Sequence, residues 1–254
     1  MSIPEIPTLT RGNLLPPLEV YLLGVVDFDE VQRLQRRLVY DLGEQTGAAL
    51  ILCEHPPTIS VGRAGSRAHI RADDSELRAM GVPVRWVNRG GGVVLHLPGQ
   101  LVGYLMLPLQ AFELDVRRYV DGLHRVLIDV LAEFDLHGSD REPAPGVFLG
   151  PSRVATVGVA VGRWIAYHGF SLNVGAYLEP FRMLDEPEDN AGRQAIRVTS
   201  MEAWRQRPTP MAKVREALIR QIETTFGLER HHLYTAHPLI RRKVRDDVFA
   251  ASYQ

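Results

Sequence analysis

The order of the apolar segments along this chain of 254 residues constrains its fold more than any other feature. Between residues 48 and 174, apolar segments of strand length follow one another, and only one long helical pattern lies among them. A doubly wound parallel sheet needs a helical crossover between successive strands, and most of these strands have none. We therefore predict a single domain of the α+β class. The predicted strands cover residues 21–26, 48–53, 84–87, 93–96, 101–107, 147–149, 154–161 and 164–174.

Three segments have the apolar spacing of amphipathic helices. The clearest covers residues 115–134, where apolar side chains recur every three or four positions. Another follows Asp27 or Asp29, either of which is a suitable N-cap. The last runs through residues 210–226, with Thr209 as the expected N-cap and a proline in the first turn.

The ends of the chain differ from its middle. Residues 1–17 contain four prolines and no periodicity, which is typical of an extended arm. Residues 231–254 include a cluster of basic side chains and are predicted to form a tail. The domain itself is therefore expected to cover residues 18–230.

Charge and apolar content limit the partners and the location. Twenty-nine basic and thirty acidic side chains leave a net charge of -1, so no overall field attracts nucleic acid or an anionic membrane. No segment approaches the roughly 18 apolar residues of a membrane span, and no basic segment followed by an apolar run opens the chain. We expect no nucleic-acid partner, no membrane partner and a cytoplasmic protein. The single cysteine, Cys53, excludes an internal disulfide.

One glycine-rich segment is a candidate ligand loop. Arg89 is followed by three glycines between two predicted strands, where a bare backbone can approach a ligand. The segment lacks the lysine and hydroxyl of a phosphate-binding loop, and its spacing does not fit a dinucleotide fingerprint. Taken alone, it is either a hairpin turn or a ligand loop. His96 and a Pro-Gly-Gln turn follow one strand later.

Four ordered motifs then resemble those of the lipoyl(octanoyl) transferase family. The family signature, Arg-Gly-Gly followed after four residues by His-Gly-Pro-Gly-Gln, is similar to residues 89–100 of this chain. The other three similar segments are Glu54-His55-Pro56-Pro57 with Gly62-Arg63, Pro145-Gly146-Val147, and the segment at residues 163–174. The order and the separations agree from about residue 20 to residue 226.

This resemblance implies a fold, an activity and partners. The fold is that of the biotin and lipoate protein ligases, a mixed β-sheet flanked by helices. The activity is transfer of an octanoyl group from acyl carrier protein to a lysine of lipoyl domains, in 2-oxoacid dehydrogenase or glycine cleavage proteins, with no cofactor and no metal. The implied substrate-binding residues are Arg89, Gly90, Gly91, Gly92, Val93, Val94, Leu95, His96, Thr156, Val157, Gly158, His168, Gly169, Phe170 and Ser171.

The chain departs from the family at two catalytic positions. Arg153 stands where the family has a lysine, and its guanidinium keeps the charge but does not accept a proton near neutral pH. No thiol occurs at residues 182–198, where the family has its nucleophilic cysteine, and this stretch contains an acidic loop at 184–194. Leu95 and Leu97 also replace a tyrosine and a glycine of the signature. We therefore expect direct attack of the acceptor lysine on the bound thioester, with Arg153 as the catalytic cation.

Several alternatives stay open at this point. One alternative is an inactive family member that binds acyl groups or lipoyl domains. Another is an adenylate-using ligase, although the binding lysine of such a ligase has no counterpart at residues 1–212, because the first of the chain's two lysines is Lys213. Cys53 is interpreted as a buried structural residue, with a relocated nucleophile as the alternative. His96 and His168 are either catalytic or loop histidines that hydrogen-bond to backbone groups.

Overall fold

The structure, a computed structural model, describes residues 17–43, 47–141, 146–185 and 196–240. Its main feature is a large mixed β-sheet with the strand order β12-β1-β2-β6-β10-β9-β8-β7. The pairs β12·β1 and β1·β2 are parallel, and the pairs from β2·β6 through β8·β7 are antiparallel. The strands are β1 Leu18–Val25, β2 Ala48–Glu54, β6 Gln100–Pro108, β7 Gly138–Asp140, β8 Val147–Leu149, β9 Ser152–Gly162, β10 Ile165–Asn173 and β12 His231–Tyr234, and β11 Arg197–Val198 pairs with β9.

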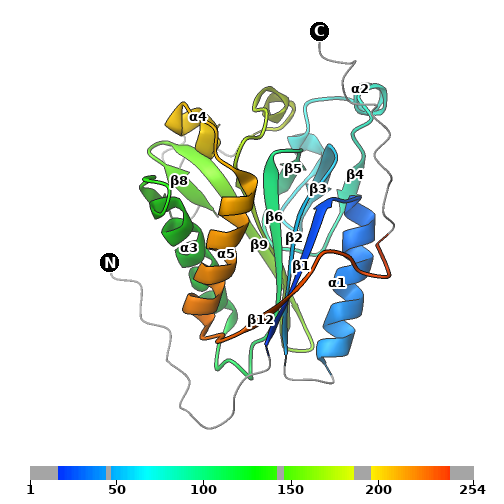
Figure 1. The fold of residues 1–254 in the computed structure, drawn as a ribbon. Helices are drawn as coiled ribbons and strands as arrows, with labels where there is room; N and C mark the ends of the chain where they lie inside the picture. Colours follow the sequence, from blue (N-terminus) through cyan, green and yellow to red (C-terminus); the bar gives the residue numbers. More distant parts are fainter. Residues whose placement is uncertain (1–16, 44–46, 142–145, 186–195, 241–254) are drawn as a thin grey trace.

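Helices cover both faces of this sheet (Figure 1). Helices α3 Val116–Ala132 and α5 Met211–Phe226 lie on one face, and α1 Phe28–Leu42 lies on the other. The side chains of β2 alternate between the two faces of the sheet. Leu50 and Leu52 belong to the core under α3 and α5, while Ile51 and Cys53 belong to the core under α1. Because both faces are covered, β2 is a continuous apolar run, as the sequence predicted.

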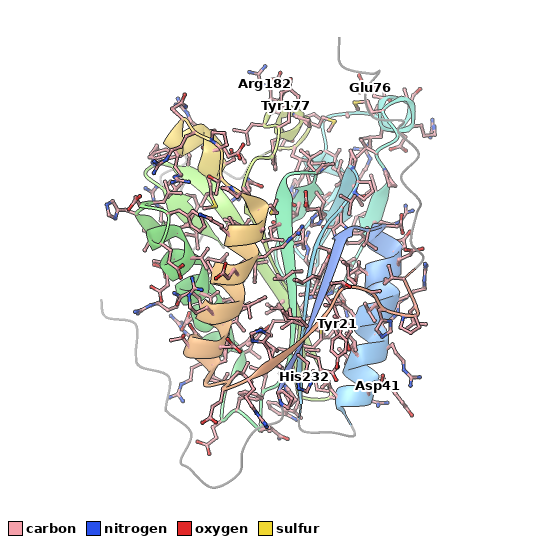
Figure 2. The ribbon with its side chains drawn as sticks, viewed as in Figure 1. Tyr21, Asp41, Glu76, Tyr177, Arg182 and His232 are labelled. Atoms are coloured by element: carbon pink, nitrogen blue, oxygen red, sulfur yellow. The ribbon has the colours of Figure 1, made fainter. Side chains whose placement is uncertain are left out.

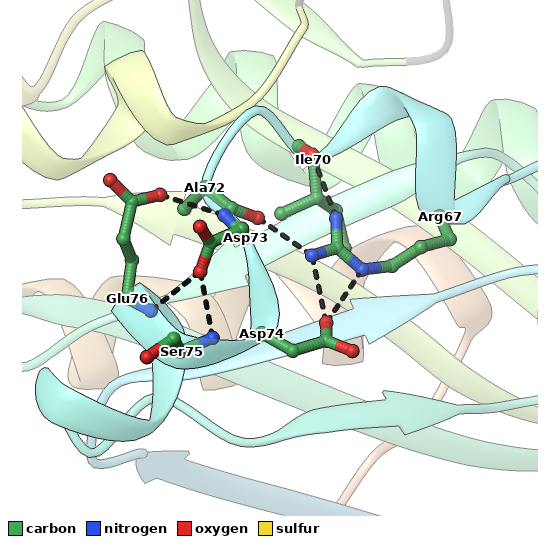
Figure 3. A network of polar contacts seen from close by, with 7 residues as sticks. All are labelled: Arg67, Ile70, Ala72, Asp73, Asp74, Ser75 and Glu76. Carbon is green, nitrogen blue, oxygen red and sulfur yellow. Dashed lines mark hydrogen bonds and ion pairs between the residues drawn. The ribbon is translucent and has the colours of Figure 1, made fainter.

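A second sheet of three strands, in the order β4-β3-β5, stands beside the first. It contains β3 Thr58–Val61, β4 Val84–Trp86 and β5 Val93–His96, with α2 Asp74–Ala79 packed against it through Leu77. Figure 3 shows the polar contacts that fix the segment leading into α2. The Arg67 guanidinium donates to the carbonyls of Ile70 and Ala72 and pairs with Asp74, while Asp73 and Glu76 form a capping box. This unit presents β5 and the following turn to the large sheet.

The C-terminal part of the chain corrects one sequence prediction. His231–Tyr234, which the sequence assigned to a basic tail, form β12 and pair in parallel with β1. Tyr234 stacks on Tyr21 with ring centroids 5.0 Å apart. Figure 2 shows Tyr21 and His232 on the side of the molecule where these two strands lie together. The sheet therefore continues beyond residue 230, whereas residues 1–16 of the expected arm and residues 241–254 of the tail are not among those described.

The other predicted helices and strands are present, and one helix cap differs from its prediction. Asp115 is the N-cap of α3, Asp27 is the N-cap of α1 and Gly43 is its C-cap. Thr209 is not the N-cap of α5, because the helix starts at Met211 after Pro210. The hydroxyl of Thr209 instead accepts a hydrogen bond from Arg205, at 2.9 Å. The sequence did not predict η1 Arg67–His69, η2 Glu179–Met183 and α4 Met201–Arg205, nor the elements α2, β3, β7 and β11. Across the described ranges, every helix is too short or too polar to cross a membrane.

Candidate functional site

The site is a cavity between the small sheet and the large one. Strand β5 forms one wall of it and strands β9 and β10 form the opposite wall. Nine of the residues that the sequence implied for substrate binding line this cavity. They are Arg89, Val94, His96, Thr156, Gly158, His168, Gly169, Phe170 and Ser171.

The glycine segment is a rigid corner beside the cavity. The turn after β3 donates three backbone hydrogen bonds to it, from Gly62 to Gly92 O, from Arg63 to Arg89 O and from Ala64 to Gly91 O. Gly91 has a φ of +79°, which glycine adopts without strain. These bonds use the carbonyls of Arg89, Gly91 and Gly92. Gly90, Gly91 and Gly92 therefore shape the corner, and they are not among the residues that line the cavity.

Arg89 is a buried cation that closes this corner from inside. Its guanidinium donates from Nη1 to the carbonyls of Gly90 and Gly92, and from Nη2 to the carbonyl and hydroxyl oxygens of Ser60 at 2.9 and 2.8 Å. Burial lowers the pKa of Arg89 to about 10, so the group stays charged at neutral pH. The cavity therefore has a fixed positive charge on one wall.

Gly158 lets the glycine segment touch the large sheet. The backbone N–H of Gly90 donates to Val159 O of β9 at 2.8 Å. A Cβ placed on Gly158 would lie 2.9 Å from Gly90 O and 3.3 Å from the Arg89 side chain. Contact at this distance requires glycine at position 158, because a backbone oxygen has no room to move away.

His96 belongs to a buried chain of hydrogen bonds. Gln100 donates from Nε2 to Asn173 Oδ1, so its Oε1 accepts, and the Nδ1 of His96, 3.2 Å away, carries the proton. The Nε2 of His96 then accepts from Ser60 Oγ at 2.9 Å. Burial comes first among the causes that hold the pKa of His96 well below its usual value, followed by the neighbouring His55 and Arg89. The imidazole is therefore neutral and fixed in one tautomer.

His168 stands at the far end of the cavity. Its Nε2 lies 3.1 Å from Asn88 Oδ1, and its backbone N–H donates to Gln35 Oε1 at 3.0 Å. Burial, with a smaller contribution from Arg89, lowers the pKa of His168 to about 3. Both histidines lie on strands and bond to side chains, which differs from the loop histidines with backbone partners that the sequence offered as one alternative.

Arg153 lies beside an adjoining pocket. This inner pocket is also lined by Val94 and Thr156, which line the cavity too, and by Val198 of β11. Arg153 is thus near one end of the cavity and His168 is near the other. The acidic loop at 184–194, where the family has its cysteine, lies almost wholly outside the described residues.

Some implied residues do not line the cavity, and some lining residues escaped the sequence analysis. Val157 is buried in the core under α3, and Val93 and Leu95 line the inner pocket instead. The cavity residues missed by the sequence are Phe28, Ser60, Val102 and Tyr104. Ser60 went unnoticed because β3 has only four residues and no alternation.

Cys53 is structural. It is fully buried on β2, and burial raises the pKa of its thiol far above the usual value. Its sulfur lies 3.7 Å from His55 Nε2, which also bonds to Tyr104 Oη. Burial lowers the pKa of His55 to about 4. A neutral histidine and a protonated thiol do not form an activated nucleophile.

Comparison with known proteins assigns this site to a family. Residues 27–223 match the family described as Lipoyl protein ligase A/B catalytic domain. The chain belongs to this family, as its motifs indicated.

Its relatives include several octanoyltransferases. The chain is 36% identical over 212 residues to the octanoyltransferase of Xanthomonas campestris pv. campestris strain B100, covering 84% of this chain and 87% of the relative. It is 37% identical over 221 residues to that of Myxococcus xanthus, covering 84% of this chain and 60% of the relative. The chain therefore spans less than two thirds of the Myxococcus protein.

Solved structures confirm the predicted fold. The structure is similar to a lipoate-protein ligase A bound with ATP, with a TM-score of 0.71, 14% identity and coverage of 88% of this chain and 91% of the other. It is also similar to a bi-partite lipoate protein ligase of Thermoplasma acidophilum, with a TM-score of 0.68, 16% identity and coverage of 88% of each chain. At these identities the similarity defines the fold alone, an α+β fold of the lipoate ligase type.

Proposed function

We propose that this protein transfers an octanoyl group from acyl carrier protein to a lysine of a lipoyl domain. The observation that carries the proposal is the cavity itself, where Arg89, Val94 and His96 of the family's glycine motif line the same space as the segment 168–171. The relatives named octanoyltransferase support the same activity. The finer proposal is that the lipoyl domains are those of 2-oxoacid dehydrogenase and glycine cleavage proteins.

The proposed chemistry is one direct acyl transfer. The neutral amine of the acceptor lysine attacks the thioester carbonyl, an amide C–N bond forms, the C–S bond breaks, and the proton lost by the amine ends on the departing thiol. Correct alignment of the two reactants supplies much of the rate. Arg153, beside the inner pocket, stabilises the negative charge that develops on the carbonyl oxygen.

The buried histidines have a binding role in this proposal. His96 and His168 have lowered pKa values and fixed partners, so neither takes the proton of the lysine at neutral pH. They orient the walls of the cavity instead. The implied residues that line the cavity bind the acyl chain, and Gly90, Gly91 and Gly92 hold that wall in place.

The intact mass of a lipoyl domain tests the proposal. The domain is incubated with octanoyl-acyl carrier protein, with and without this protein. We expect the mass to increase by one octanoyl group much faster with the protein present. An unchanged rate would favour the catalytically inactive alternative, a protein that binds acyl groups or lipoyl domains.

Replacement of Arg153 by alanine tests its assigned role. Loss of a group that stabilises an oxyanion typically lowers a rate by about 10²–10³-fold, and we expect this loss for Arg153→Ala in the same assay. Octanoate affinity should change little, because burial of the apolar chain supplies it. Arg125→Ala removes an arginine from the exposed face of α3 and is the control. An undiminished rate in Arg153→Ala would show that the catalytic group lies elsewhere.

A further inference from the structure

Three hollows adjoin one another, because neighbouring hollows share lining residues. The inner pocket with Arg153 shares Val94 and Thr156 with the cavity, and the cavity shares Phe28 with a larger outer cleft of about 980 Å³. This outer cleft lies between α1, the segment after β4 and the β9–β10 hairpin. An acyl chain whose carbonyl lies near Arg153 therefore points its methyl end toward the outer cleft.

A polar wall separates the cavity from the outer cleft. His168 lines the cavity, whereas Gln35, Asn88 and Tyr167 line the cleft. Asn88 donates from Nδ2 to Tyr167 Oη, so its Oδ1 is the acceptor and the Nε2 of His168 is the donor. The rings of Tyr167 and His168 are stacked with centroids 5.0 Å apart. These contacts hold the imidazole between the two hollows.

The backbone of the wall is fixed as firmly as its side chains. His168 has a φ of +62°, an uncommon conformation for a residue with a side chain, and Gly169 follows with a φ of +156°. Gln35, 1% exposed on α1, accepts from the N–H of His168 and keeps this conformation in place. Its own Nε2 is buried without a hydrogen-bond partner. A group that entered from the cavity would have to break this arrangement.

We propose that the wall made by His168, Asn88 and Gln35 sets the longest acyl chain that the cavity accepts. The inference rests on the proposed function for the identity of the ligand and goes beyond it by assigning its length selectivity. A chain that ends before the wall keeps every hydrogen bond intact. A longer chain must displace the imidazole, which leaves the N–H of the buried His168 without its acceptor. Behind the wall, the outer cleft offers ample space.

Binding of saturated fatty acids from 6 to 16 carbons, measured by calorimetry, tests the inference. Each buried methylene raises affinity about fourfold. We expect this rise in the wild type up to a limiting length, after which affinity levels off or falls. Asn88→Ala frees the imidazole, and His168→Gly removes it at a backbone position that glycine adopts without strain. Either variant should move the limit upward by at least two carbons, about a 15-fold gain for the longer acids.

Two control variants separate this effect from a general loosening. Trp86→Ala changes an exposed residue of the same cleft that is not one of the three wall residues, and its limit should match the wild type. Asn88→Asp retains an acceptor oxygen for His168. Its limiting chain length should therefore stay within one methylene of the wild-type value. An affinity that rises without a limit in the wild type would overturn the inference, and so would an unmoved limit in both Asn88→Ala and His168→Gly.

The outcome is independent of catalysis. If the limit moves in the variants but no lipoyl domain is octanoylated, the wall inference stands and the transfer proposal fails. If the domain is octanoylated but the limit does not move, the transfer proposal stands and the wall inference fails.

Discussion

At the scale of the residue, the site depends on the buried charge of Arg89 and on the absence of a side chain at Gly158, which lies next to it. Arg89 is buried, and among the described residues no carboxylate lies within ion-pair distance of it. Four hydrogen bonds to Ser60, Gly90 and Gly92 replace its lost water. Gly158 lies against this group, because a Cβ there would come within 2.9 Å of Gly90 O and 3.3 Å of the Arg89 side chain. The positive wall of the cavity thus depends on a residue that carries no charge.

Gly158→Ala should therefore weaken both the fold and the acyl site. Its Cβ would lie 2.9 Å from Gly90 O, and overpacking of this kind costs about 1–3 kcal/mol of unfolding free energy. We expect that loss in urea denaturation, together with weaker octanoate binding. Gly162→Ala, on the same strand, is the control, because its Cβ would meet Tyr167 at an ordinary 3.5 Å. Equal effects of the two substitutions would contradict the role of Gly158.

At the scale of the element, α1 connects the start of the chain to the cavity. Its first residue, Phe28, lines the cavity, and Gln35, two turns later, holds the backbone of His168. Asp27 begins the helix and accepts from the N–H groups of Asp29 and Glu30, at 2.9 and 3.2 Å. The position of this cap therefore sets the position of both contacts.

Asp27→Ala should lower the unfolding free energy by about 1 kcal/mol, because the helix loses its cap. Asp27→Asn keeps an acceptor oxygen, so it should lower the unfolding free energy by only a small part of this amount. Chemical denaturation of the three proteins at neutral pH measures the difference. If asparagine and alanine destabilise equally, the hydrogen bonds of the cap are not the cause.

The elements that sequence analysis predicted are those with strong local patterns. Both long helices that flank the core on one side, the buried strand β2 and the glycine corner all have such patterns. The strands β3 and β12 have none: β3 is four residues long, and every residue of β12 is exposed. Strand β12 pairs with β1, and Tyr234 stacks on Tyr21, so its contacts join distant parts of the chain.

The site was predictable where a motif marked it and hidden where packing made it. The segments 89–96 and 168–171 were identified from family motifs, and the structure brings Arg89, Val94 and His96 of the first to one cavity with the second. Asn88 and Gln35 carry no motif signal. The sequence did contain one signal for Gln35, because it is a polar residue beside the apolar stripe of Val31, Leu34 and Leu38 on α1. A polar side chain in such a position often has a buried partner.

At the scale of the whole molecule, three uncharged histidines lie buried around one cavity. His55 and His168 have pKa values lowered to about 4 and about 3, and the pKa of His96 is also far below normal. In the unfolded chain these groups titrate near 6.5. Between the two values the unfolded chain binds more protons than the folded protein. Acid therefore favours unfolding, and the stabilisation is complete only above about pH 6.5.

The unfolding free energy should accordingly fall as the pH is lowered from 7 to 5. Each of these histidines contributes a slope that approaches roughly 1.4 kcal/mol per pH unit, so three of them approach roughly 4. Urea denaturation at pH 7, 6 and 5 measures this slope. His168→Asn removes one titrating group and keeps a residue that tolerates the positive φ, so its slope should be about a third smaller. His232→Gln changes an exposed histidine of β12 and should keep the wild-type slope. A free energy that stays constant between pH 7 and 5 would show that these histidines are not held neutral by burial.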